Sequence, residues 1–182
     1  MKKIGLFCVL FALMLIGHSC IEEQDFGQYD DLSVIPKFES SIIYIEATEE
    51  VINLAPNTTF YSQEFDFNPF SESVFADRVV DGVITYELEN TTSKDLDIKL
   101  EFLDESGVIL DTEIFSPIYK APSAVLKREV VYGNTGESLD IIINTSKIRV
   151  TANNLSDNSS VSTQPEPLIV LKSSGKFSVR VK

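Results

Sequence analysis

Residues 96–103, which read LDIKLEFL, decide the fold class of this chain. Apolar and charged side chains alternate, so that Leu96, Ile98 and Leu100 fall on one face and the charged residues between them fall on the other. Because successive side chains of a strand point to opposite sides, the pattern predicts a β-strand with one buried and one solvated face. The next four residues, DESG at 104–107, are typical of a hairpin loop.

Two further stretches, 83–89 and 176–182, alternate in the same way. Shorter runs predict additional strands near 41–47, 58–67, 108–115, 124–132, 139–143, 147–151 and 168–172. Turn residues break the chain at 133–136 and 173–175, and no segment after residue 20 keeps a helical period. Strands with one wet face predict two antiparallel sheets packed face to face, and an up-and-down barrel is the alternative.

Residues 86–110 are similar to hairpins of immunoglobulin-like and fibronectin-type sandwiches, in which one strand ends in Asn-Thr and the next in an Asp…Gly turn. Here the Asn-Thr pair is Asn90-Thr91 and the turn runs from Asp104 to Gly107. The resemblance implies an antiparallel immunoglobulin-like β-sandwich. We therefore expect a single all-β domain over residues 41–182.

The first 20 residues have the pattern of a secretory signal that ends at a cysteine. Lys2 and Lys3 precede a 13-residue apolar run over 4–16, whereas a membrane-spanning helix needs about 20 residues. The stretch resembles a bacterial lipoprotein signal, which implies a signal peptide at 1–19, cleavage after Ser19 and lipidation of Cys20. The alternative is a secreted protein with a free thiol at Cys20.

Residues 20–40 form an acidic tether in this interpretation, with a plain solvated linker as the alternative reading. The cluster EEQDF at 22–26 is similar to the export signal that moves lipoproteins of Bacteroidota to the outer face of the outer membrane. The whole chain also resembles small β-sandwich outer-membrane lipoproteins of Bacteroidota. These resemblances imply a lipid-anchored protein of the bacterial outer membrane that faces the cell surface, with the periplasmic face as the alternative.

Cleavage after Ser19 removes the residues that most catalytic and metal sites use. The only histidine (His18), both methionines and Cys8 lie in the signal, and the chain has no tryptophan. Ser-His-Asp and Cys-His catalysis, the usual zinc sites, haem and iron–sulfur clusters are therefore excluded for the mature chain. We expect no enzyme and no cofactor, although paired carboxylates leave glycoside hydrolysis open. Oxygen ligands that suit calcium occur at Asp104 and among Asp66, Asp77 and Asp81.

The charge of the chain is strongly acidic, with a formal net charge of −13. Removing Lys2 and Lys3 together with no acid makes the mature charge −15. Nucleic acid is therefore not an expected partner, because its recognition depends on Lys and Arg that neutralise phosphates. Anionic lipid is also disfavoured, so we expect membrane attachment through the acyl chains on Cys20 alone.

Two segments stand out as candidates for contact with partners. Phe65 and Phe67 share a strand face and are expected in the core, whereas Phe70 follows a proline in a predicted turn and is the candidate for an exposed partner contact. The polar segment 153–167 is predicted to be disordered, because it has little apolar surface to bury, and a functional loop is the alternative.

The last stretch of the chain is basic, with Lys172, Lys176, Arg180 and Lys182 and no acid after residue 166. We interpret it as an edge strand whose lysines discourage aggregation. Contact with an acidic partner, or with the acidic surface of the protein itself, is the alternative.

Together these features predict a non-enzymatic accessory or interaction subunit of an outer-membrane or cell-surface assembly, with an envelope protein as its partner. The alternative is a carbohydrate-binding or adhesin-like surface module. Sugar rings usually stack on aromatic side chains, and without tryptophan this role would fall to Tyr61, Tyr119 or Tyr132.

Overall fold

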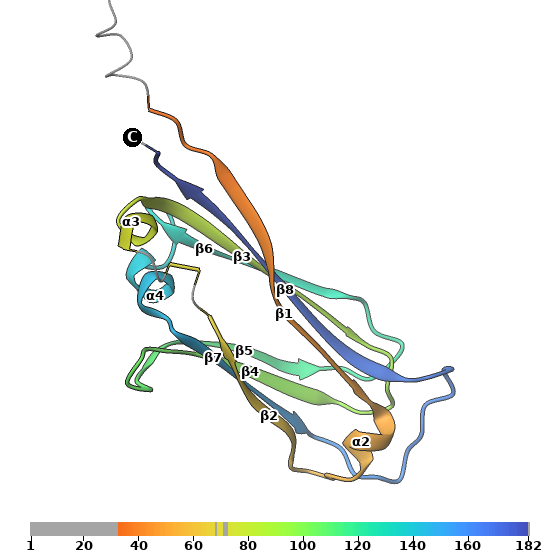
Figure 1. The fold of residues 1–182 in the computed structure, drawn as a ribbon. Helices are drawn as coiled ribbons and strands as arrows, with labels where there is room; N and C mark the ends of the chain where they lie inside the picture. The colour runs from red at the N-terminus through yellow and green to blue at the C-terminus, as the bar shows by residue number, and fades with distance from the viewer. Residues whose placement is uncertain (1–32, 68, 71–72, 182) are drawn as a thin grey trace, which may run out of the picture. The chain divides into compact units, whose positions relative to one another are not determined.

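Two antiparallel four-stranded sheets pack face to face in the computed structural model, which describes residues 33–67, 69–70 and 73–181 (Figure 1). The strands are β1 (Lys37–Thr48), β2 (Thr59–Asp66), β3 (Val79–Asn90), β4 (Leu96–Leu103), β5 (Ile109–Ile118), β6 (Leu126–Gly133), β7 (Lys147–Asn154) and β8 (Leu168–Val179). Three short helices, α2 (Glu49–Asn53), α3 (Ser73–Ala76) and α4 (Leu139–Asn144), connect them. The prediction of an all-β sandwich is confirmed.

The order of the strands refines that prediction. One sheet has the order β1-β8-β3-β6 and the other has the order β2-β7-β4-β5. Because β1 pairs with β8, β2 with β7, β3 with β6 and β4 with β5, the four pairs are nested within one another. This is a jelly-roll order, whereas immunoglobulin domains arrange their strands as ABED and CFG. Two separate sheets also exclude the closed barrel.

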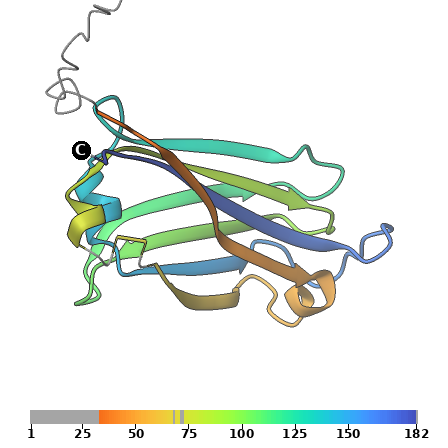
Figure 2. The same ribbon diagram turned by 45° about the horizontal axis from the view of Figure 1, so that its top comes forward.

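The nested pairs follow one long hairpin that is folded over on itself (Figure 2). Its centre is the bond between Ser106 and Gly107, in the turn between β4 and β5. Gln63 and Val150, which are opposite each other, lie equally far along the chain from that bond. In all four nested pairs the two distances differ by at most three residues. Each strand therefore finds its partner at a matching distance from the turn.

The core lies between the sheets and is built from alternate residues of the central strands. The alternation predicted over 96–103 and 83–89 is confirmed, since Leu100 of β4 and Ile84 of β3 are almost fully buried. Each such side chain contributes about 1.5–3 kcal/mol through removal of apolar surface from water. Phe67 is buried and Phe65 packs against the core, as expected.

Some element boundaries differ from the predicted ones. The strand expected at 41–47 begins at Lys37, inside the predicted tether. Residues 139–143, predicted as a strand, form helix α4. The hydroxyl of Ser138 caps this helix by accepting a hydrogen bond from the Asp140 N–H, and the helix buries Ile142 completely. A short apolar run does not by itself distinguish a strand from a helix. The capping residue Ser138 is the feature of the sequence that favours a helix here.

Strand β8 is central in its sheet, with β1 on one side and β3 on the other. The predicted break at 173–175 and the predicted edge strand are therefore both wrong. Ser173 lies within β8, where its hydroxyl accepts a hydrogen bond from the Ile43 N–H at 3.2 Å. Gly175 also stays in the strand, and the absence of its side chain leaves room for the ring of Phe177. That ring also packs edge-on against Phe70, with centroids 5.0 Å apart.

The close approach of Phe177 to Gly175 gives a test of the packing. A Cβ atom at residue 175 would lie 2.6 Å from Cε2 of Phe177, and the movement of that ring is restricted by Phe70, which packs edge-on against it. We expect Gly175→Ala to reduce the free energy of unfolding by about 1–3 kcal/mol in urea titrations. Ser174→Ala, on the opposite face, is the matched control and should change it by less than about 0.5 kcal/mol. Equal stability of the two variants would contradict this packing.

Candidate functional site

One end of the sandwich is built entirely from loops that cross between the sheets. We call it the loop end, and it consists of α2 with the loops 54–58, 91–95, 119–125 and 155–167. It lies at the opposite end of the domain from the start of β1 and the end of β8 (Figure 1). Its loops are held by buried polar side chains, which is unusual because such groups are normally exposed.

Glu49, the first residue of α2, is one of these buried groups, with 3% of its surface exposed. Its carboxylate accepts hydrogen bonds from the N–H and the hydroxyl of Ser93, at 3.0 and 2.6 Å, and from the Ser162 N–H at 3.0 Å. Hydrogen bonds to a charged acceptor are stronger than neutral ones. Glu49 therefore joins α2 to two loops that are 69 residues apart in the sequence.

Lys94 is the second buried group and is fully enclosed, with 0% of its surface exposed. Its ammonium group donates hydrogen bonds to the backbone oxygens of Asp157 at 2.8 Å and Ser160 at 2.7 Å, and to the Ser160 hydroxyl at 3.0 Å. A lysine ammonium has three protons to donate, so these three oxygens satisfy it. The loop 155–167 is thus wrapped around a cation that belongs to the protein itself.

Two buried asparagines connect the remaining loops to this network. The Asn90 side-chain amide donates to the backbone oxygens of Lys94, at 2.8 Å, and Tyr119, at 3.0 Å. The Asn154 amide donates to the Ile52 oxygen of α2 at 3.2 Å. Buried side chains therefore join α2 to the loops 91–95, 119–125 and 155–167, and the loop 54–58 is joined through its backbone, from the Asn57 N–H to the Ser156 oxygen at 3.1 Å.

The prediction of disorder over 153–167 is wrong for a physical reason. The segment has almost no apolar surface to bury, but its backbone oxygens and N–H groups are bonded to Lys94 and Glu49. Polar groups buried with their partners can order a loop that apolar packing cannot. Both residues were missed in the sequence, where Lys94 sits in a turn-like stretch and Glu49 in an acidic pair.

The network leaves several apolar side chains pointing into solvent at the loop end. Leu54 is 81% exposed, Val161 is 73% exposed and Tyr119 is 65% exposed. Single exposed apolar residues are common, but these three stand on loops whose backbones are fixed. Fixed loops with exposed apolar and aromatic tips suit contact with another protein, because little conformational entropy is lost on binding.

Of the residues predicted to be functional, Phe70 is not where it was expected. Its side chain is 8% exposed and belongs to the core, so the expected exposure is wrong. Its ring packs edge-on against Phe177, whose own ring lies against Gly82 and Gly175. Cys20 and most of the tether lie outside the described residues. Within the part of the chain that the structure describes, no helix is long and apolar enough to cross a bilayer.

The acids considered for calcium have other roles or lie apart. Oδ1 of Asp104 accepts hydrogen bonds from the N–H groups of Ser106 and Val108, both at 2.8 Å, and so stabilises the central turn. Asp66, Asp77 and Asp81 are exposed. Over 33–67, 69–70 and 73–181, no three acidic, histidine or cysteine side chains come together as metal ligands do.

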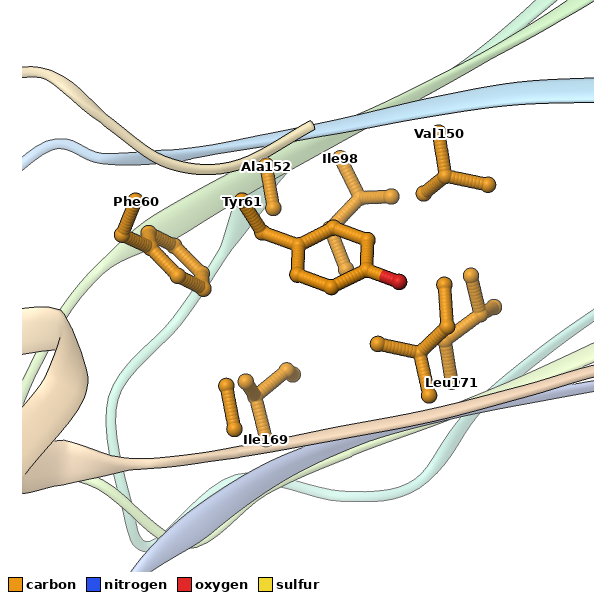
Figure 3. A pocket seen from close by; sticks show the side chains of 9 residues that line it. Phe60, Tyr61, Ile98, Val150, Ala152, Ile169 and Leu171 are labelled. Atoms are coloured by element: carbon orange, nitrogen blue, oxygen red, sulfur yellow. The ribbon is translucent and has the colours of Figure 1, made fainter. Parts of the chain in front are cut away.

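The tyrosines considered for sugar stacking lie in three different environments. Tyr132 is fully buried, and only Tyr119 is largely exposed. Tyr61 covers an apolar hollow between the sheets, lined by residues such as Ile98 and Leu171 (Figure 3). The hollow has a volume of about 10 Å³, which holds no more than one water molecule. Among the three, Tyr119 alone presents a ring to solvent at the loop end.

A second group of charged side chains lies between β5 and β6, which are edge strands of the two different sheets. The guanidinium of Arg128 stands 4.1 Å from the centre of the Phe115 ring and donates to Glu113 at 3.1 Å and to the Ile114 oxygen at 3.0 Å. Glu113 is opposite Leu100 in the β4–β5 pair, so its side chain points inward. Burial raises the pKa of Glu113, although its hydrogen bond with Arg128 opposes the shift. Arg128 of β6 therefore connects the two sheets through its bonds to Glu113 and Ile114 of β5.

Comparisons with known proteins were made for the sequence and for the fold. No family model and no curated protein matches the chain. It is similar to the VP2 subviral particle of infectious bursal disease virus, at 11% identity and a TM-score of 0.38, over 82% of this chain and 33% of that one. It is also similar to Bacillus endospore appendages (9% identity, TM-score 0.34, 81% and 91% covered) and to turnip yellow mosaic virus (10%, 0.35, 83% and 82%). The chain spans about a third of the length of the VP2 chain. All three scores are below 0.5, so the fold assignment depends on the strand order alone.

The role of Lys94 can be tested with Lys94→Met, which keeps the length of the side chain and removes its charge. The backbone oxygens of Asp157 and Ser160 would then lack their donor, and we expect a loss of about 2–4 kcal/mol in the free energy of unfolding. Amide hydrogen exchange over 155–167 should rise strongly. Lys120→Met, on a neighbouring loop where the lysine is exposed, is the control and should change neither quantity. Unchanged exchange in Lys94→Met would refute the role of the ammonium.

Two glutamates should affect the pH dependence of stability with opposite signs. The pKa of Glu113 is raised, so its stabilising contribution is present below its ordinary pKa and is lost as the pH rises through the raised value. Hydrogen bonds from Arg149 and Lys147 lower the pKa of Glu64, so its contribution is present above its ordinary pKa and is lost as the pH falls. In urea titrations between acid and neutral pH, Glu113→Gln should gain stability relative to wild type as the pH rises. Glu64→Gln should lose it, and parallel curves for the two variants would contradict both assignments.

Proposed function

We propose that this chain is a lipid-anchored accessory protein of the bacterial outer membrane that binds an envelope protein through its loop end. Cys20 would carry the anchor and residues 20–32 would form the tether. The chain would act by binding and would catalyse no reaction. The expected orientation places the domain at the cell surface, with the periplasmic face as the alternative.

The observation that carries the proposal is the fixed loop end. Glu49 and Lys94 are buried at the cost of removing two charges from water, a cost that a simple spacer domain would have no reason to bear. Their hydrogen bonds join α2 to the loops 91–95 and 155–167, and a backbone hydrogen bond from the Asn57 N–H to the Ser156 oxygen at 3.1 Å joins the loop 54–58 to them. Leu54 and Val161 are exposed on these loops, as the anchors of a protein interface are before the partner binds.

A carbohydrate-binding or adhesin-like module is the second candidate. It is favoured by one observation, the exposed ring of Tyr119 at the loop end. Aromatic rings supply a flat apolar face and a polar tip, which suits a sugar ring. A single ring without a neighbouring cleft gives a weaker site than the apolar tips give for a protein, so we place this function second.

Site-specific photo-crosslinking in cells tests the proposal. A photoreactive amino acid replaces Leu54 or Val161 at the loop end, and Ser62, which is exposed on β2, serves as the matched control. After detergent extraction, we expect one envelope protein to be crosslinked at both loop-end positions and none at residue 62. Recovery of the lipoprotein alone from all three variants would reject the proposal. Binding to an arrayed glycan that disappears in Tyr119→Ala would favour the second candidate instead.

A further inference from the structure

We infer that the end of the domain opposite the loop end rests on an anionic membrane surface. This end, which we call the ribbon end, consists of residues 33–40 and 176–181 together with Arg78. It includes the start of β1 and the end of β8, which lie side by side (Figure 1). The inference deepens the proposed function and depends on it, because Cys20 must hold the domain near the bilayer.

The first observation is the apolar surface at the ribbon end. Val34, Phe38 and Val181 are each about half exposed, at 50%, 51% and 50%, and Ile35 is 44% exposed. Their backbones are ordered, since the Val181 N–H donates to the Val34 oxygen at 2.9 Å. Apolar and aromatic side chains of this kind are stable at the level of the lipid headgroups, where one part of the side chain leaves water.

The second observation is the distribution of basic residues. Within the described ranges, the exposed cations without a carboxylate partner within 4.0 Å are Lys37, Arg78, Lys120, Lys172, Lys176 and Arg180. Four of these six are at the ribbon end, where the Arg180 N–H bonds to the Arg78 oxygen at 2.8 Å. Most other cations are neutralised within the sheets.

Nearby acids do not cancel this charge. Glu39 is the only acid within 33–40 and 176–181, which together carry Lys37, Lys176 and Arg180. Asp77 shares a shallow hollow with Arg78 and Arg180, and the exposed Asp81 is opposite Ser178 in the β3–β8 pair. The four cations of the ribbon end therefore outnumber the three nearby acids, Glu39, Asp77 and Asp81, by one. The ribbon end is therefore locally positive on a chain with a net charge of −13. The inference therefore departs from the expectation that anionic lipid is disfavoured, because attraction within one Debye length depends on the local charge.

The third observation is the length of chain between the anchor and the domain. The described residues begin at Ser33, so 13 residues from Cys20 to Leu32 precede them. A flexible coil of this length spans about 20 Å and a fully extended one about 45 Å. A tether this short brings the end to which it is joined toward the bilayer. That end carries both exposed apolar residues and four of the six exposed cations described above, and the loop end then faces away from the bilayer.

Depth-dependent quenching on the full lipidated protein tests the inference. Ile35→Cys at the ribbon end and Leu54→Cys at the loop end are labelled with a fluorophore, since the Cys20 thiol is blocked by lipid. The proteins are reconstituted into vesicles of phosphatidylethanolamine and phosphatidylglycerol that contain nitroxide-labelled lipid. We expect loss of most of the fluorescence at residue 35 and none at residue 54. Lys176→Glu combined with Arg180→Glu should restore the fluorescence at residue 35, as should vesicles without phosphatidylglycerol.

Each other outcome overturns the inference in a recognisable way. Equal quenching at residues 35 and 54 would mean that the domain has no fixed orientation. If quenching at residue 35 appears only after the five acids of 22–31 are replaced by neutral residues, the acidic segment covers the ribbon end in place of lipid. Mass spectrometry of the N-terminal peptide reports the anchor separately. A Cys20 without lipid would reject the proposed function and this inference together, whereas a lipidated Cys20 without quenching would reject the inference alone.

Discussion

The nested pairing of strands about the Ser106–Gly107 bond is the constraint on which the rest of the structure depends. Each strand must meet a partner at a matching distance from this bond, because a slip of one residue would turn every side chain to the opposite face. Register shifts lie in three of the nested pairs: between Ser41 and Ile43 in β1–β8, between Thr59 and Tyr61 in β2–β7, and between Leu96 and Ile98 and between Phe102 and Leu103 in β4–β5. Each of them changes the difference between the two distances by one residue. The turn that starts the arrangement is stabilised by Asp104, which bonds to two N–H groups within it.

In a jelly roll the segments that cross between the sheets lie at the two ends of the sandwich, and in this protein the two ends are stabilised in different ways. At the end opposite the loop end, the crossings contain the short helices α3 and α4, and α4 buries Ile142 in the core. At the loop end, hydrogen bonds from buried polar side chains hold the crossing segments in place. Buried charges are costly unless every hydrogen bond is made. Lys94 and Glu49 each make three hydrogen bonds. A change in the loops that broke one of these bonds would leave a buried charged group incompletely bonded.

The class of fold could be predicted because the alternation in β3 and β4 is local and is caused directly by burial of one face. The order of the strands could not be predicted, because the hairpin over 86–110 is shared by several kinds of sandwich. The central position of β8 could not be predicted, because Ser173 and Gly175 are residue types typical of turns. The ring of Phe177 explains why a glycine is needed at residue 175. Lys94 gave no signal in the sequence, because its significance comes from oxygens more than 60 residues away. The identity of Cys20 as a lipidation site stays a prediction.

The pairing of the first strand with the last has a mechanical consequence. Strand β1 is hydrogen-bonded to β8 in an antiparallel ladder that extends from Lys37 to Thr48. If the tether pulls at one end of β1 while a partner holds the loop end, the force runs along the strands and across their hydrogen bonds. The hydrogen bonds of the ladder are then loaded together in shear, whereas a pull at right angles to the strands would break them one after another. The arrangement that closes the fold is therefore also suited to carrying tension between the two ends of the domain.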